Sequence, residues 1–114
     1  MKKVIINGKT LRVERGEYRD GSLAVTVEEE YYDEVFGGDI CEPFGCLTVN
    51  LAPYSGTAAL LQNGDHAFVK DWSENEGWAD ALASTIGAKP LGVFVPCGYV
   101  KARLWDFSGV DWDE

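Results

Sequence analysis

The first part of the chain alternates apolar and polar residues with the period of β-strands. Residues 4–6 and 10–14 are separated by Asn7-Gly8, a dipeptide that tolerates the positive φ angles of a type I′ turn. After a second turn signal at Asp20-Gly21, apolar residues at alternate positions of 23–27 predict a half-buried strand. These patterns predict a hairpin and then a third strand, which continues with falling hydrophobicity into an acidic run.

Residues 44–51 predict a central strand around which the fold is organised. Leu47, Val49 and Leu51 share one face of this strand, as one buried side requires. Gly37-Gly38 and Pro43 predict a loop before it. Residues 52–56 end it, residues 57–64 fit a helical turn or a short strand equally well, and residues 67–70 predict a short strand.

A helix is predicted from about residue 74 to residue 86. Ser73 and Glu76 have the spacing of a capping box, in which two side chains satisfy free amide groups at the helix start. Trp78, Leu82 and either Thr85 or Ile86 recur at helical spacing and predict a core-facing stripe. Gly87 follows as a C-terminal cap.

Two further strands, 91–95 and 99–105, are predicted with Pro96-Cys97-Gly98 as a hairpin loop. Alternation places Tyr99, Lys101, Arg103 and Trp105 on one face, which either packs as a second layer or binds an anionic partner. The acidic tail, about 108–114, is expected to be mobile or loosely docked. The chain is therefore predicted to be one α+β domain over 1–114. A bent antiparallel sheet of about five to seven strands would carry one principal helix on one face.

The composition disfavours some classes of binding partner and favours another. The 114 residues are 46% apolar, enough for one core, and the net charge is −9. Such an acidic chain disfavours binding to nucleic-acid phosphates and to anionic membranes, but it suits a basic partner protein. Residues 1–6 do not resemble a signal peptide, and no apolar run approaches the roughly 20 residues that span a bilayer, so a cytoplasmic location is expected.

The residues that could carry catalysis or bind metal are few. Cys41, Cys46, Cys97 and the single histidine, His66, lack the paired spacing of a zinc site. Gly37-Gly38 lacks the Lys-Ser/Thr pair of a phosphate-binding loop. We therefore predict no catalytic residues, no metal, no cofactor and no enzymatic activity.

The segment 28–43 is the best candidate for function, because it holds seven carboxylates and no Lys or Arg. Aromatic residues stand among these acids, as they do at the centres of protein interfaces. The candidate partner-binding residues are Glu28, Glu29, Glu30, Tyr31, Tyr32, Asp33, Glu34, Phe36, Asp39 and Glu42. The alternative is that the tyrosines cover the core while the acids form a solvated face.

Several short motifs together resemble a known family. They are Asn-Gly-Lys-Thr at 7–10, Glu-Pro-Phe-Gly-Cys-Leu-Thr-Val-Asn-Leu at 42–51, Ala-Phe-Val-Lys-Asp at 67–71, Gly-Ala-Lys-Pro-Leu-Gly at 87–92 and Cys-Gly-Tyr-Val at 97–100. From residue 4 to residue 107 the chain is similar to a bacterial family of short α+β proteins of unknown function. The resemblance implies carriage on conjugative or phage-like mobile elements of gut bacteria, and it transfers no catalytic residues. The acidic stretch at 31–42 departs from the family pattern, in which a shorter connection is expected.

These observations lead to one hypothesis and one alternative. The hypothesis is a non-catalytic inhibitor from a mobile element, an anti-CRISPR or antirestriction protein. Its acidic segment would mimic DNA and block the basic groove of a CRISPR nuclease or restriction enzyme. The alternative is a small housekeeping interaction module that self-associates through a sheet edge or through the 99–105 face.

Overall fold

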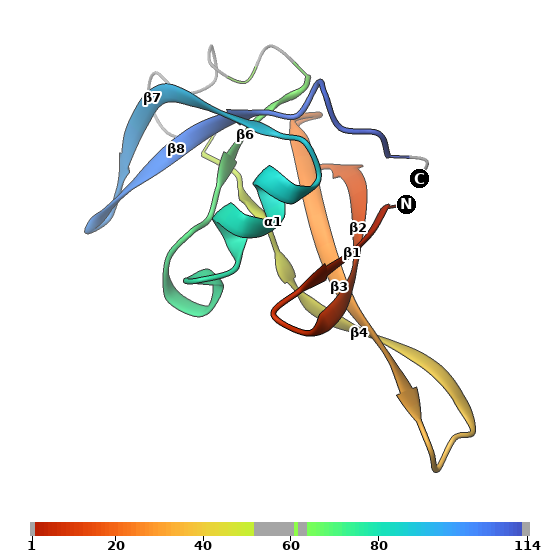
Figure 1. The fold of residues 1–114 in the computed structure, drawn as a ribbon. Coiled ribbons are helices and arrows are strands. Elements are labelled where there is room, and N and C mark those ends of the chain that lie inside the picture. The colour runs from red at the N-terminus through yellow and green to blue at the C-terminus, as the bar shows by residue number, and fades with distance from the viewer. Residues whose placement is uncertain (1, 52–60, 62–63, 113–114) are drawn as a thin grey trace.

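The structure is a computed structural model that describes residues 2–51, 61 and 64–112. In these residues, eight strands form two antiparallel four-stranded sheets, with strand orders β1-β2-β3-β4 and β5-β6-β8-β7. One α-helix, α1 (Ala79–Thr85), lies between β1 and the second sheet (Figure 1). The predicted α+β class is confirmed, but the prediction of one bent sheet is wrong because the strands divide into two sheets. The predictions for 52–56 and for most of 57–64 lie outside the described residues.

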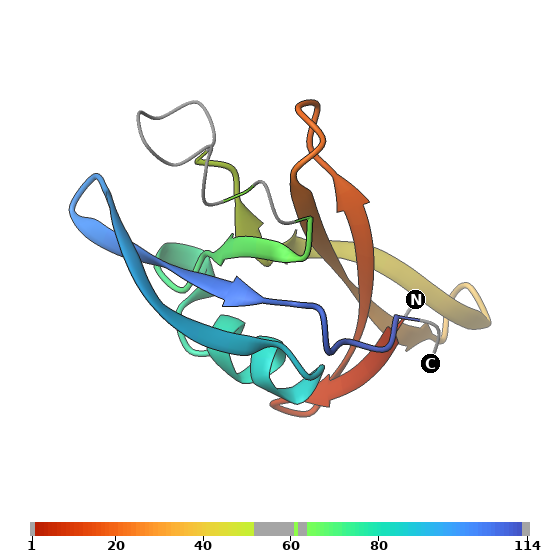
Figure 2. The same cartoon turned by 90° about the horizontal axis from the view of Figure 1, so that it is seen from above.

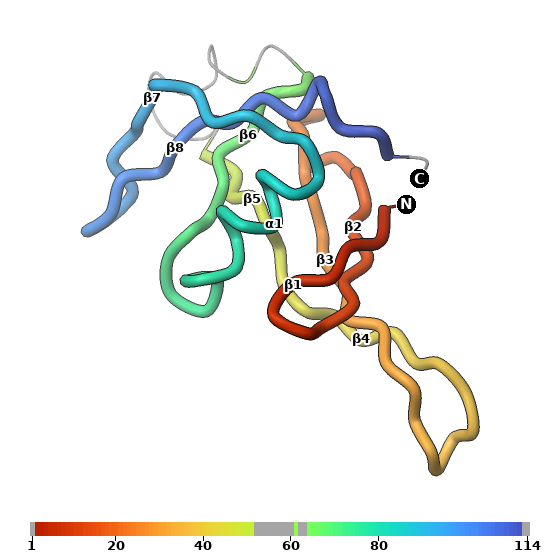
Figure 3. The backbone as a smooth tube through the Cα atoms, viewed as in Figure 1, coloured from red at the N-terminus to blue at the C-terminus, as the bar shows by residue number. Residues whose placement is uncertain are grey.

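The first sheet is built from consecutive hairpins, which Figure 3 follows along the backbone. Its strands are β1 (Lys2–Ile6), β2 (Lys9–Glu17), β3 (Leu23–Asp33) and β4 (Gly38–Cys46). Asn7 and Gly8 have φ angles of 52° and 79°, which confirms the predicted hairpin and its turn. The Asp20-Gly21 turn is also confirmed, since the Gly21 amide donates to the carbonyl of Tyr18 at 2.9 Å.

The second sheet collects strands from the rest of the chain. They are β5 (Thr48–Val49), β6 (His66–Val69), β7 (Lys89–Cys97) and β8 (Val100–Asp106). The predicted β7–β8 hairpin is confirmed, although its turn is shorter than expected, because Cys97 pairs directly with Val100.

The stretch 44–51 is not a central strand. It is the crossover between the sheets: β4 ends at Cys46, β5 begins at Thr48, and both are edge strands. Leu47 lies between them, where its amide donates to the Val25 carbonyl at 2.9 Å and its carbonyl accepts from the Lys70 amide at 2.8 Å. Leu47 and Leu51 are buried as alternation predicted, but they belong to different hydrophobic clusters, and Thr48 on the predicted polar face is also buried.

The main core lies between the sheets and beneath α1. Its fully buried side chains include Leu11, Val13, Val25 and Val27 from the first sheet, Val69 from the second, and Ala79 and Leu82 from the helix. A smaller cluster covers the opposite face of the second sheet and contains Leu51, Phe68, Ala102 and Leu104. Burial of this apolar area is the main stabilising contribution to the fold.

The helix is shorter than predicted, and its capping box is wrong. Ser73 has a φ of 59° and begins a 3₁₀ turn, η2 (Ser73–Asn75), with no side-chain cap. Gly77, at a φ of 90°, then separates this turn from α1. The predicted stripe is confirmed with Ile86 as its third member, because Trp78, Leu82 and Ile86 are buried whereas Thr85 is exposed. Gly87, at a φ of 101°, follows the helix as predicted.

The tail, predicted to be mobile or loosely docked, contacts the core at Val110 and Trp112, whereas Ser108, Gly109 and Asp111 are exposed. Phe107 is fully buried, Val110 is 8% exposed, and the rings of Phe107 and Trp112 stack with centroids 6.4 Å apart. This stacking places Trp112 against the main core. No helix among the described residues has the length and apolar character needed to cross a membrane.

A projecting acidic arm as candidate functional site

The acidic segment forms the outer part of the β3–β4 hairpin and projects from the body of the molecule (Figures 1 and 2). We call residues 28–43 the arm. β2 pairs with β3 only as far as Glu30, so beyond that residue the arm is a ribbon of β3 and β4 alone. The prediction of a loop at Pro43 is wrong, because Pro43 lies within β4. Proline has no amide donor, but β4 is an edge strand and Pro43 lies beside a shift in register, so the strand tolerates it.

The tip of the arm is a defined turn. The Asp33 carboxylate accepts hydrogen bonds from the amides of Val35 and Phe36 at 2.8 and 2.9 Å. The Gly37 amide donates to the Asp33 carbonyl at 2.8 Å, and Gly37 adopts a φ of 79°. These contacts hold the apolar side chains outward, so that Val35 is 99% exposed and Phe36 73%.

Exposed apolar side chains and exposed acidic side chains lie together at this tip. Tyr32 is 63% exposed beside the turn, and the acidic residues Glu34 and Asp39 are also exposed. We call Tyr32, Glu34, Val35, Phe36 and Asp39 the arm tip. The sequence analysis did not include Val35 among the partner-binding residues. Its position between Glu34 and Phe36 was a signal that an apolar side chain would be exposed at the turn.

Near the body, two of the arm's carboxylates are paired with basic residues of β1 and β2. Glu30 lies 3.0 Å from the Lys3 ammonium and 3.9 Å from the Arg12 guanidinium, and Glu29 lies 3.4 Å from Lys9. The side chain of Glu30 is only 19% exposed. The negative charge presented to solvent is therefore concentrated toward the tip, away from the Glu28-Glu29-Glu30 run.

Tyr31 and Glu42 form a cross-strand contact within the arm. The Tyr31 hydroxyl donates to the Glu42 carboxylate at 2.6 Å. This hydrogen bond, together with burial and nearby carboxylates, raises the pKa of Tyr31 to about 12. Both residues thus have a partner within the arm, which rigidifies it and leaves Tyr32 and Phe36 as the more accessible aromatic residues.

The cysteines and the histidine are placed apart. Cys41 lies on the arm, where the Arg12 guanidinium donates to its sulfur at 2.6 Å; this contact, with nearby acids, raises the pKa of Arg12. Cys46 lies near Thr48 at the crossover. His66 faces Asp106 across the second sheet, and Cys97 ends β7. Among residues 2–51, 61 and 64–112, no three His, Cys, Asp or Glu side chains gather to hold a metal.

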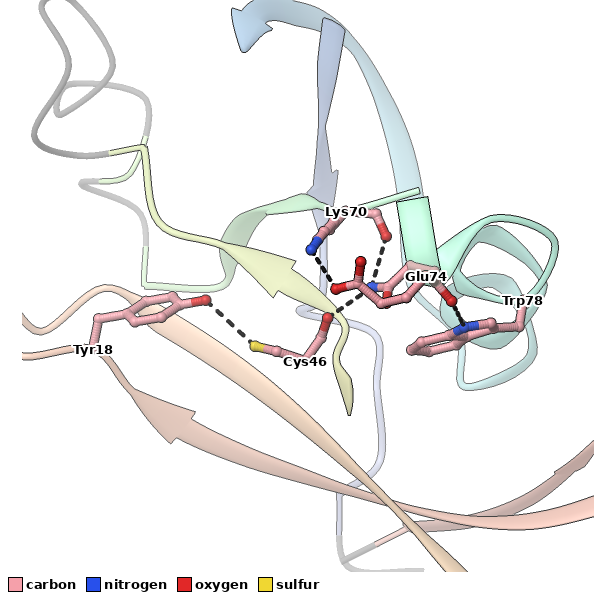
Figure 4. Close-up of polar contacts among 6 residues, drawn as sticks. Tyr18, Cys46, Lys70, Glu74 and Trp78 are labelled. Carbon is pink, nitrogen blue, oxygen red and sulfur yellow. Dashed lines mark hydrogen bonds and ion pairs between the residues drawn. The ribbon is translucent and has the colours of Figure 1, made fainter. Parts of the chain in front are cut away.

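The arm is anchored where its strand passes into the crossover (Figure 4). The Tyr18 hydroxyl lies 3.6 Å from the Cys46 sulfur and 2.9 Å from the Thr48 hydroxyl, and burial raises the pKa of Tyr18. On the other side, the Asn75 amide donates to the carbonyls of Cys46 and Lys70 at 2.8 and 3.0 Å. Polar side chains from two separate segments, at Tyr18 and Asn75, therefore hold the crossover in place.

Nearby contacts hold η2 against α1. The Trp78 indole donates to the Glu74 carbonyl at 3.0 Å, and the Lys70 ammonium pairs with the Glu74 carboxylate. The hydrogen bond from Lys70 lowers the pKa of Glu74 to about 2. These contacts connect η2 to the residue that precedes α1 and to the residue that follows β6.

A second exposed surface lies at the turn end of the β7–β8 hairpin. Tyr99 and Lys101 are exposed there, and Phe94 is 52% exposed with the Arg103 guanidinium 5.0 Å from its ring centre. The predicted face packs into the main core at Trp105, as the second-layer alternative expects, and it is exposed toward the turn. Phe94 was missed, although it pairs with Arg103 across the hairpin.

No family model, no curated protein and no solved structure matches the chain.

Proposed function

We propose that this protein is a non-catalytic binding protein that inserts its arm tip into a basic cleft of a partner protein. The observation that carries the proposal is the exposure of Tyr32, Val35 and Phe36 on an ordered, projecting hairpin. A solvated acidic face gains nothing from exposing three large apolar side chains, because their transfer to water is unfavourable. Buried in a partner, the same side chains contribute binding energy.

The charge supports a basic partner. Glu34 and Asp39 flank the apolar side chains, so the complementary surface is an apolar pocket bordered by Lys and Arg. Grooves that bind nucleic acid supply such basic borders. The resemblance to proteins of mobile elements favours an anti-defence role. In that role the arm would obstruct the groove of a CRISPR nuclease or a restriction enzyme, and mimicry would depend more on the tip than on the Glu28-Glu29-Glu30 run.

The first test compares the wild type with a protein whose arm is shortened. Because Glu30 pairs with Cys41, replacing residues 31–40 by Asn-Gly joins the two strands through a type I′ turn and preserves the sheet below. Partners captured by the wild type alone are candidates, and each is purified for binding measurements. The proposal expects a basic, nucleic-acid-handling protein whose substrate binding is blocked by the wild type.

The second test separates the apolar from the charged contribution. Val35→Ser with Phe36→Ser is expected to raise the dissociation constant for the purified partner by about tenfold or more, since central apolar anchors dominate interfaces. Glu34→Gln with Asp39→Gln is expected to slow association mainly at low salt. Glu17→Gln with Glu76→Gln is the matched control, because it removes the same charge from exposed positions elsewhere. Equal affinity of the wild type and the tip variants would refute the proposal.

A further inference from the structure

The turn end of the β7–β8 hairpin combines aromatic surface with positive charge. Phe94 and Tyr99 are exposed, and Lys101 and Arg103 stand on the same hairpin. Lys101 forms no ion pair with any residue that the structure describes. We call Phe94, Tyr99, Lys101 and Arg103 the hairpin patch.

The hairpin patch is basic although the chain carries a net charge of −9. Lys3, Lys9 and Arg15 are each paired with a carboxylate of the same chain. Residues 91–103 contain Lys101 and Arg103 but no acid. Arg103 attracts the Asp80 carboxylate of α1, so Lys101 supplies the positive charge of the patch that is unpaired among the described residues. A local positive surface on an acidic protein attracts an acidic partner.

The arm tip is the matching surface. It offers carboxylates at Glu34 and Asp39 where the hairpin patch offers cations, and it offers the exposed aromatic rings of Tyr32 and Phe36. Aromatic rings of the two surfaces can pack against one another, and Lys101 is free to pair with a carboxylate.

The two surfaces of one molecule do not meet. The arm and the β7–β8 hairpin extend from opposite sides of the body in both views (Figures 1 and 2). The protein measures 49 Å along its longest axis. Contact between these surfaces therefore requires two molecules.

We propose that the hairpin patch binds the arm tip of a second copy of this chain, so that the protein self-associates head to tail. Such a contact joins two different surfaces and leaves each end open, so it extends into chains or closes into a ring. The inference rests on the proposed function, since it uses the arm tip as a binding element, and self-association would compete with binding of the basic partner.

The test measures the mass of the full chain in solution by sedimentation equilibrium. At low salt the mass of the wild type is expected to rise with concentration above the monomer value of 12.5 kDa and to return toward it as salt is added. Lys101→Glu is expected to weaken association by about tenfold or more, because like charges at a contact are strongly unfavourable. Arg19→Glu is the matched control: it changes the net charge equally at an exposed position away from both surfaces, and it is expected to associate like the wild type.

A mixture of charge-reversed proteins gives the decisive result. Glu34→Lys alone should associate as weakly as Lys101→Glu alone. A mixture of the two variants should associate strongly, because each retains the surface that the other has lost. A wild type that stays at the monomer mass at low salt, single reversals that associate like the wild type, or a mixture that does not associate would overturn the inference.

The same variants separate this inference from the proposed function. Lys101→Glu leaves the arm tip intact, so its affinity for the basic partner should be retained. A monomeric wild type that still binds its partner through the arm overturns self-association alone. The protein with the shortened arm should lose both activities.

Discussion

Asn75 offers the sharpest test of how the two sheets are joined. Its side chain is 1% exposed, and its amide donates to the carbonyls of Cys46 and Lys70 at 2.8 and 3.0 Å. One carbonyl belongs to the end of β4 and the other directly follows β6. Asn75→Ala removes both donors and leaves two acceptors in the interior without these partners.

The expected cost follows from these two bonds. A buried polar group left without its partner costs about 1–3 kcal/mol. The Asn75 side-chain oxygen is buried with no hydrogen-bond partner in the described residues, so its removal offsets part of the loss. Asn75→Ala should therefore lower the free energy of unfolding by about 2–4 kcal/mol.

Asn75→Asp tests the direction of the hydrogen bonds. At neutral pH a carboxylate would present an acceptor and a negative charge to two carbonyls, so this variant should be less stable than Asn75→Ala. Acidification that protonates the carboxyl group should restore part of the stability, because the protonated group donates one hydrogen bond.

The assay is denaturant unfolding followed by tryptophan fluorescence, since Trp78 and Trp105 are buried in the main core. Glu76→Ala is the control, as it truncates the exposed neighbour of Asn75. A loss below about 0.5 kcal/mol for Asn75→Ala, which is the range of ordinary surface substitutions, would refute the reasoning. Equal stability of the Asp and Ala variants at neutral pH would refute the assigned donor direction.

Three further predictions concern single contacts. Tyr31 has a pKa raised to about 12, so its phenol should ionise above the ordinary value of 10. Glu42→Gln should lower the pKa of Tyr31 in a titration followed by ultraviolet absorbance. An unchanged pKa would exclude the hydrogen bond to Glu42 as the cause. Glu74 has a pKa lowered to about 2 from 4.5 by Lys70, so its stabilising contribution should be complete above pH 4.5 and vanish as the pH falls toward 2. The stability difference between the wild type and Glu74→Gln should shrink over that window, and a difference independent of pH would contradict the pairing. At Gly45, an added Cβ would lie 3.3 Å from the nearest carbon of the Trp78 indole. Gly45→Ala should therefore lower the free energy of unfolding, measured with a chemical denaturant, by about 1–3 kcal/mol. An unchanged free energy of unfolding would show that the Trp78 ring moves aside without cost.

The candidate site could be predicted in composition but not in geometry. The sequence shows that acids and aromatic residues are concentrated at 28–43, and these residues do form one structural unit, the arm. The pairing of Glu29 with Lys9 and of Glu30 with Lys3 depends on strand register across β1, β2 and β3. Register joins residues distant in the chain, so the shift of exposed charge toward the tip was not visible in the sequence.

Local chemistry determined the elements that the sequence predicted correctly. Asn7-Gly8 specified its turn because these residues tolerate positive φ, and the spacing of Trp78, Leu82 and Ile86 placed a buried stripe on the helix. Both signals act between residues a few positions apart. Neither signal depends on hydrogen bonds to distant segments of the chain.

The tertiary structure decided which sheet each strand joins and where the helix begins. Residues 44–51 alternate as one strand would, yet the chain changes sheets at Leu47, because its amide and carbonyl bond to Val25 and Lys70. The spacing of Ser73 and Glu76 suits a helix start, but Asn75 instead bonds to carbonyls brought close by the fold. In both places hydrogen bonds to residues outside the element that the pattern implied replace the bonds within it, and only the packed structure supplies those partners.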